Sequence, residues 1–185
     1  MRLKLNNLCF AFVIVLLAGC SIVGSQHGSQ VDFTDTGQWT MRAKLSVRQN
    51  TDIHTLNTYW QQNSEQYEIQ LFGLFGAGRT TLSSHQQGVA ITQGSDTQLY
   101  PSARQALAAN TGLSLPIEGL PYWLRGLPSP QASATQAENP EGQISQLQQM
   151  GWKITYSAYF ESGLPRKMQI SRDTIFIKII VKQWQ

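Results

Sequence analysis

An alternating run begins at residue 39 and reads Trp39-Thr40-Met41-Arg42-Ala43-Lys44-Leu45-Ser46-Val47. Its odd-numbered residues are apolar and its even-numbered residues are polar. Side chains of a β-strand point alternately to its two faces, so a period of two places all of the apolar residues on one face. The run therefore predicts a half-buried strand, with one face in a core and the other in water.

Shorter stretches of the same kind follow along the chain. We expect further strands at 54–61, 66–71, 80–84, 88–92, 98–100, 144–149, 152–158, 167–171 and 175–184. Residues 127–142 contain three prolines and many small polar residues, which favours a loop. About ten strands joined by short turns are typical of a mainly β protein with a curved antiparallel sheet, open or barrel-like.

The pattern changes to a helical one between the two groups of strands. Ser102 can cap a helix over residues 103–109, and Gly112 can end it. A second short helix is expected to carry Pro121 in its first turn and to stop at Gly126. We expect these helices to cover the mouth of the sheet.

The N-terminal residues have the features of an export signal. Arg2 and Lys4 precede an apolar run, residues 8–17, which closes in Leu17-Ala18-Gly19-Cys20. The run is too short to span a bilayer comfortably as a helix. Leu-Ala-Gly-Cys resembles the bacterial lipobox, in which the cysteine thiol receives a diacylglyceryl group and the signal is cut before it. The alternative is an ordinary secreted protein whose cleavage site happens to precede a cysteine.

This interpretation predicts residues 1–19 as a signal peptide, 20–37 as a lipidated flexible tether and 38–185 as the folded domain. Removal of the signal takes away two cations and lowers the formal charge from +3 to +1. The remaining lysines and arginines are scattered, so we expect no nucleic-acid partner. Cys9 leaves with the signal and Cys20 carries lipid, so no disulfide is expected.

Ser21 would follow the lipidated cysteine. In lipoproteins of enteric-type bacteria, aspartate at that place favours retention in the inner membrane. By this resemblance the protein is expected at the outer membrane, anchored through Cys20 and facing the periplasm.

Signals for catalysis are weak throughout the chain. His54 and His85 have no Cys, Asp or Glu neighbours at the spacing of metal ligands. No Gly-x-Ser-x-Gly motif occurs, and the glycine-rich residues 73–78 lack the Lys-Ser/Thr of a phosphate-binding loop. We therefore expect no enzymatic activity, no metal and no cofactor.

Two bulky apolar residues lie where a hairpin tip is expected. Leu74 and Phe75 stand between Gly73 and Gly76, and loop tips are normally exposed. One hypothesis is that they insert into a membrane or bind a lipid. The other is that both side chains fold back under the sheet.

Several motifs occur together in one order. They are the lipobox, Tyr59-Trp60-Gln61-Gln62, Leu74-Phe75-Gly76, Leu115-Pro116, Trp123-Leu124-Arg125-Gly126-Leu127-Pro128, Gly151-Trp152-Lys153-Ile154-Thr155-Tyr156, and Ile177-Lys178-Ile179 with Trp184. This set resembles the LolB family of outer-membrane lipoproteins, whose members receive other lipoproteins and insert them into that membrane. The resemblance covers essentially all of the chain after the signal peptide.

The resemblance implies an unclosed antiparallel β-barrel of about ten or eleven strands, with a short helical lid over a hydrophobic cavity. It implies that Trp60, Trp123 and Trp152 line a cavity for acyl chains. Phe75 matches the protruding apolar residue of the family's loop, with Leu74 beside it where proline is common. Partners would be the periplasmic carrier LolA, acylated lipoprotein cargo and outer-membrane lipid, and the protein would be a monomer.

Two other functions stay open. A lipocalin-like lipoprotein would bind a small apolar ligand in the same kind of cavity. A structural accessory of an outer-membrane assembly machine would use the apolar loop to dock a protein.

Overall fold

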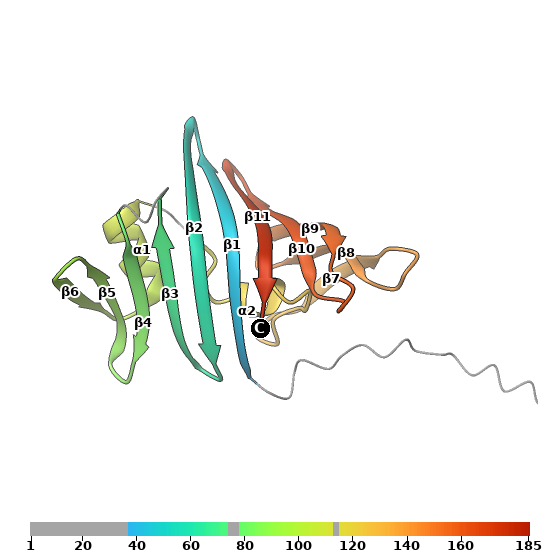
Figure 1. The fold of residues 1–185 in the computed structure, drawn as a ribbon. Coiled ribbons are helices and arrows are strands. Elements are labelled where there is room, and N and C mark those ends of the chain that lie inside the picture. Colours follow the sequence, from blue (N-terminus) through green and yellow to red (C-terminus); the bar gives the residue numbers. More distant parts are fainter. Residues whose placement is uncertain (1–36, 74–77, 113–114) are drawn as a thin grey trace, which may run out of the picture. The chain divides into compact units, whose positions relative to one another are not determined.

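The computed structural model describes residues 37–73, 78–112 and 115–185, all of which belong to one compact unit. This part contains one eleven-stranded sheet and two short helices (Figure 1). The elements are β1 (Gln38–Gln49), β2 (Asp52–Asn63), β3 (Gln66–Phe72), β4 (Thr80–His85), β5 (Gly88–Gln93), β6 (Asp96–Tyr100), α1 (Ala103–Thr111), α2 (Leu120–Trp123), β7 (Ala134–Glu138), β8 (Ile144–Gln149), β9 (Trp152–Tyr159), β10 (Pro165–Arg172) and β11 (Ile175–Trp184).

The sheet is antiparallel and its strand order is β6-β5-β4-β3-β2-β1-β11-β10-β9-β8-β7. Two runs of hairpins are joined where the first strand, β1, pairs with the last, β11. The edge strands β6 and β7 are not paired with each other within the described residues, so the sheet stays open. The expected mainly β, unclosed antiparallel architecture is confirmed.

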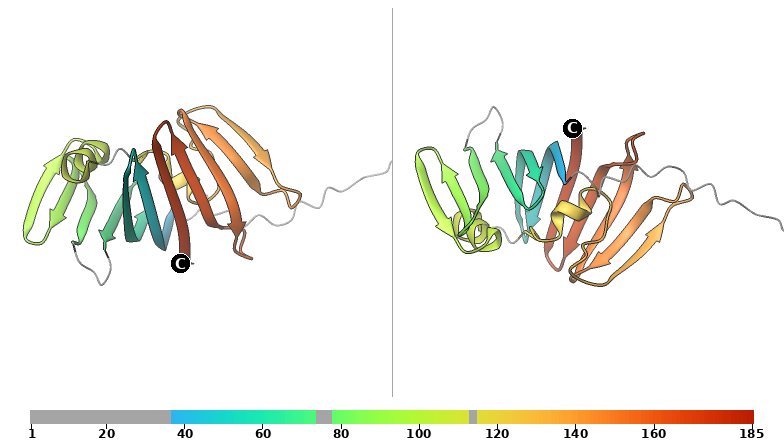
Figure 2. Two further views of the ribbon diagram at one scale, coloured as in Figure 1. Left: turned by 90° about the horizontal axis from the view of Figure 1, so that it is seen from above. Right: turned by 90° about the horizontal axis from the view of Figure 1, so that it is seen from below.

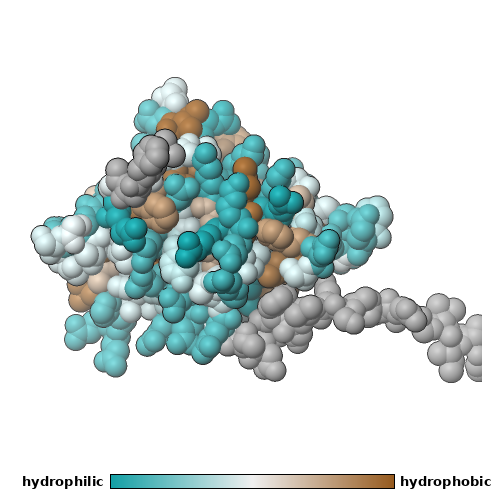
Figure 3. Space-filling view, in the orientation of Figure 1, coloured by the Kyte–Doolittle hydropathy of each residue, from teal (hydrophilic) through white to brown (hydrophobic). Residues whose placement is uncertain are grey.

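Strand β1 lies near the middle of the sheet and has the predicted alternation. Met41, Ala43 and Val47 are buried, whereas Arg42 and Lys44 are exposed. Because β1 pairs along its length with β2 and β11, its apolar side chains form the centre of the inner face. Figure 3 shows one face of the molecule in the orientation of Figure 1, and hydrophilic residues predominate on it.

Both helices lie against the inner face of the sheet (Figure 2). The predicted ends of α1 are confirmed: the Ser102 hydroxyl accepts a hydrogen bond from the Gln105 amide at 3.3 Å. Gly112 follows the helix with a φ of 67°, a conformation that glycine adopts without strain. At α2, a Cβ on Gly119 would lie 2.4 Å from the Trp123 ring, so only glycine allows the indole to pack there.

The prediction of a loop over residues 127–142 was wrong in part, because β7 lies within it. This strand pairs with β8 at the edge of the sheet, and all five of its residues are exposed. A strand that is wet on both faces has no apolar alternation, so its sequence carries no strand signal. Its position is set by backbone hydrogen bonds to β8.

Among the helices that the structure describes, none is long and apolar enough to cross a bilayer.

Candidate functional site

An apolar cavity lies between the inner face of the sheet and the two helices. Met41, Trp60, Ile69 and Leu82 form part of its wall, from four neighbouring strands. They also form one cross-strand row, because Met41 pairs with Trp60, Trp60 with Ile69, and Ile69 with Leu82. Facing side chains in such a row touch one another, so the sheet presents a continuous apolar surface to the cavity.

The opposite wall comes from the lid, by which we mean the described residues 102–112 and 115–126. It contributes Leu107, Leu115, Ile117, Leu120 and Leu124. Each of these side chains is at most 7% exposed. Their burial against the sheet is the main favourable contribution that holds the lid in place.

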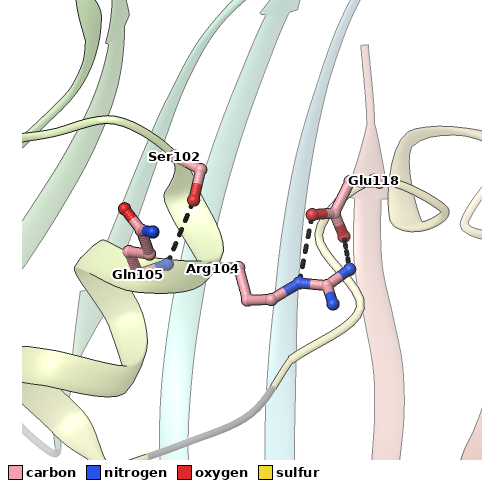
Figure 4. A network of polar contacts seen from close by, with 4 residues as sticks. All are labelled: Ser102, Arg104, Gln105 and Glu118. Atoms are coloured by element: carbon pink, nitrogen blue, oxygen red, sulfur yellow. Dashed lines mark hydrogen bonds and ion pairs between the residues drawn. The ribbon is translucent and has the colours of Figure 1, made fainter.

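An ion pair on the surface joins two parts of the lid. The Arg104 guanidinium donates from Nε and Nη2 to the two carboxylate oxygens of Glu118, at 3.2 and 3.0 Å (Figure 4). This hydrogen bonding, with the charge of Glu118, raises the pKa of Arg104. The side chains are 60% and 40% exposed, so water screens their attraction. The pair links α1 to the turn before α2 but does not link the lid to the sheet.

The cavity is small, at about 40 Å³. A single water molecule needs roughly 10–15 Å³ on the same measure. The expected hydrophobic cavity under helices is therefore present, and the lid is closed over it.

One polar side chain stands out in the cavity wall. Thr58, on β2, is 3% exposed, and its Oγ1 has no hydrogen-bond partner among the described residues. The Trp60 indole N–H, in the same wall, donates to Gln62 Oε1 at 2.9 Å. A buried hydroxyl without a partner costs roughly 1–3 kcal/mol, so Thr58 is not explained by the fold alone.

A hydrogen-bond network fixes α2 to the other half of the sheet. Gln149 of β8 is 3% exposed, and its Oε1 accepts from the Trp123 indole at 2.7 Å and from the Ser129 amide at 2.8 Å. Its Nε2 donates to the carbonyls of Ser129 and Ala132, at 2.7 and 2.6 Å. All the polar capacity of this buried amide is therefore used.

Two tyrosines of β9 continue this network. The Tyr156 hydroxyl donates to the Trp123 carbonyl at 2.8 Å, and the Tyr159 hydroxyl donates to the Ile144 carbonyl. Burial raises the pKa of both tyrosines, and the neighbouring Tyr159 adds to the rise at Tyr156. Both phenols are neutral donors at physiological pH.

The three tryptophans predicted to line the cavity lie in different places. Within the described residues, the cavity wall includes Trp60 but not Trp123 or Trp152. Trp123 is fully buried in the α2 network, and Trp152 packs under Arg172, whose guanidinium carbon is 4.3 Å from the ring centroid. That all three contact an acyl chain stays a prediction.

The other predicted site residues, Cys20, Leu74 and Phe75, lie outside the described residues. Sequence reasoning missed Thr58 and Gln149. Thr58 carried one signal, because it is a polar residue between Leu56 and Trp60 on the apolar phase of its strand. Gln149 carried none, since its partners are distant in sequence.

A second depression, of about 280 Å³, lies beside the cavity. Leu71 lines both, and the depression also has polar side chains from Thr80, Gln93 and Asn110. In the part of the chain that the structure describes, no group of three or more His, Cys, Asp or Glu residues could hold a metal ion.

Comparison with solved structures finds the same fold in proteins of very different sequence. A DUF1329 family protein from Desulfovibrio piger superimposes with a TM-score of 0.51 at 10% identity, over 82% of this chain and 86% of that one. A putative outer membrane lipoprotein-sorting protein domain from Vibrio parahaemolyticus gives 0.50 at 6% identity, over 80% and 85%. At these identities the likeness concerns the fold alone.

Sequence comparison is more specific. The family model described as outer membrane lipoprotein LolB matches residues 37–184. The LolB protein of Chromohalobacter salexigens is 30% identical, over 94% of this chain and 87% of its own length. That of Stutzerimonas stutzeri is 27% identical, over 98% and 96%. The chain therefore belongs to the LolB family of outer-membrane lipoproteins.

Proposed function

We propose that this protein accepts lipoproteins from the periplasmic carrier LolA, binds their acyl chains in the cavity under the lid, and inserts them into the inner leaflet of the outer membrane. The observation that carries the proposal is the apolar cavity between sheet and lid, in a chain whose whole folded part matches the LolB family. The role is one of binding and transfer, without an enzymatic step.

The physical need for such a cavity follows from the cargo. Burial of each methylene is worth about 0.8 kcal/mol, so release of a multiply acylated protein into water is very unfavourable. The acyl chains need an apolar environment at every step between the two membranes. With no nucleotide-binding motif in the sequence, we infer that transfer runs downhill, from LolA to this cavity and then to the bilayer.

The closed cavity of about 40 Å³ is far too small for a long acyl chain, so cargo binding requires the lid to move. We infer that α1 moves and α2 stays. The inner side of α1 is formed by Ala103, Ala106 and Leu107, and two of these bury little area. By contrast, α2 is held by the Trp123–Gln149 hydrogen bond and its neighbours.

Each predicted site residue has a role in this proposal. Cys20 carries the lipid anchor, and Leu74 and Phe75 touch the bilayer to begin delivery. Trp60 contacts the acyl chains from the sheet side of the cavity. Trp123 holds α2 in place, and it and Trp152 keep their predicted role of contacting the acyl chains.

A transfer assay tests the proposal. The chain from Ser21 onward, which includes every described strand and helix, is mixed with LolA loaded with a labelled lipoprotein, and liposomes are added in a second step. We expect label to move to the wild-type protein and then to the liposomes. Phe75→Glu and Leu74→Glu should accept label but deliver less of it.

Leu99→Glu is the matched control, because Leu99 is a leucine on β6 that is 53% exposed. It should deliver like the wild type. Label that stays on competent LolA would overturn the receptor function. A tightly held small ligand would then favour a lipocalin-like protein, and co-purification with a stable membrane complex would favour an assembly accessory.

A further inference from the structure

Thr58 offers the one unpaired polar side-chain atom in the described wall of the cavity. Its Oγ1 is buried without a hydrogen-bond partner, while the Trp60 indole N–H in the same wall is satisfied by Gln62. A valine has nearly the same shape and would fill this place without a buried hydroxyl. The fold therefore gains nothing from the oxygen of Thr58, which points to a use in binding.

Thr80 is a second buried threonine of the inner face, and its hydroxyl differs from that of Thr58 in having a hydrogen-bond partner. Thr80 is 7% exposed and lies two strands away on the same inner face, in one cross-strand row with Thr58 and Leu71. Its hydroxyl accepts a hydrogen bond from Gln93 Nε2 at 3.0 Å. Of these two buried threonines, only Thr58 has a hydroxyl oxygen with no hydrogen bond at all among the described residues.

Thr58 also lies where the surroundings change from apolar to polar. Its cross-strand neighbour Leu71 lines both the apolar cavity and the second depression, whose wall includes Gln93 and Asn110. An amphipathic ligand with its tail in the cavity would have its polar junction near this boundary. In an acylated lipoprotein that junction is the ester that joins each chain to the glyceryl group.

We propose that the Thr58 hydroxyl donates a hydrogen bond to an ester carbonyl of the diacylglyceryl group of the cargo. A carbonyl oxygen can only accept, and the hydroxyl has a free proton to donate. The bond would distinguish an acyl ester from a plain alkyl chain, which the other wall residues cannot do. This inference rests on the proposed function, because it assumes that acyl chains enter the cavity.

The experiment compares two fluorescent lipopeptides with a free amino terminus. One carries a diacylglyceryl group with two esters, and the other carries the dialkyl ether analogue, which lacks both carbonyls. Binding is measured for the chain from Ser21 onward as wild type, Thr58→Val and Thr58→Ser. We expect Thr58→Val to bind the ester lipopeptide about tenfold more weakly and the ether equally well, and Thr58→Ser to bind like the wild type.

The same ester occurs in membrane phospholipids, so a soluble short-chain diacyl phosphatidylcholine is the third probe. An effect of Thr58→Val on the phospholipid alone would overturn the assignment to cargo. If Thr58→Val loses the same affinity for the ester and the ether lipopeptide, or loses none, the proposed hydrogen bond is overturned. The wild-type protein would still bind acyl chains in that case, so the proposed function would stand. If the wild-type protein binds neither lipopeptide, both proposals fail.

Thermal unfolding gives a second readout. We expect Thr58→Val to melt at the same temperature as the wild type or higher, since it removes an unpaired buried hydroxyl. A lower melting temperature would assign the hydroxyl to the fold and overturn the inference.

Discussion

The two halves of the inner face differ in whether their buried polar groups have hydrogen-bond partners. On the half formed by β8 and β9, the buried Gln149 uses both of its amide atoms, and Tyr156 and Tyr159 each donate to a carbonyl. On the half formed by β1 to β4, a cavity remains, and Thr58 Oγ1 lies in its wall without a partner among the described residues.

We infer from this difference that the half formed by β8 and β9 is rigid, whereas the half formed by β1 to β4 can change its conformation. Hydrogen bonds in a buried network are directional, so moving α2 would leave several polar groups unpaired at once. Apolar contacts such as those of Leu107 have no required direction, and they can be exchanged for contacts with an acyl chain at little cost. We infer that one half anchors the lid so that the other half can open.

The largest expected effect comes from breaking the network. Gln149→Leu would leave the Trp123 indole and the Ser129 amide without an acceptor, and we expect a loss of about 4 kcal/mol in the free energy of unfolding. Urea unfolding measures it. Gln148→Leu, at an exposed position of the same strand, is the control and should change little. Equal effects at the two positions would contradict the anchoring role.

We expect the buried tyrosines Tyr156 and Tyr159 to make the folded protein less stable at alkaline pH. Burial raises the pKa of Tyr156 and Tyr159 above the ordinary value of 10.0. As the pH rises above 10, tyrosine in the unfolded chain loses its proton while the folded chain keeps it, so unfolding becomes more favourable. The free energy of unfolding should fall by up to about 1.4 kcal/mol per pH unit for each tyrosine.

Urea unfolding between pH 8 and 11 tests this expectation. Tyr156→Phe should be less stable than the wild type at pH 8, because it lacks the bond to the Trp123 carbonyl, but should lose stability less steeply above pH 10. Parallel curves for the two proteins would show that Tyr156 is not kept neutral by the fold.

The two buried threonines should respond to the same substitution with opposite signs. Thr58→Val removes an unpaired hydroxyl and should raise the free energy of unfolding by about 1 kcal/mol. Thr80→Val deprives Gln93 of its acceptor and should lower it by about 1 kcal/mol. Chemical denaturation of both variants sharpens the comparison, and shifts of the same sign would argue against it.

The smallest effect is expected at the surface of the lid. Arg104→Gln removes the ion pair with Glu118, and exposed pairs contribute about 0.5 kcal/mol or less. The change should vanish in concentrated salt, which screens the pair in the wild type. A loss well above that range would mean that the pair, and not apolar burial, holds the lid.

Much of the fold follows from local patterns. The period of two in β1 predicted which side chains are buried, and Ser102 and Gly112 predicted the ends of α1. Such signals act within a few residues, so they are readable without the rest of the molecule. Strand β7 lacked any such signal because both of its faces are wet.

The site was less accessible to the same reasoning. The sequence predicted an apolar cavity under helices, and Trp60 lies in its wall, but Trp123 and Trp152 are buried elsewhere. An inward-facing tryptophan that lines a cavity has the same sequence pattern as one that packs in a core. Which of these occurs depends on the lid, whose contacts join residues far apart in the chain.

The alternation of apolar and polar residues was enough to assign strands and faces, and the lipobox and ordered motifs were enough to indicate the family. Three features depended on the folded chain: the closed state of the cavity, the anchoring of α2 by Gln149, and the unpaired hydroxyl of Thr58. The physical reason is the range of the interactions. Backbone conformation and side-chain direction are local, whereas volume and hydrogen-bond satisfaction depend on side chains brought together from distant strands.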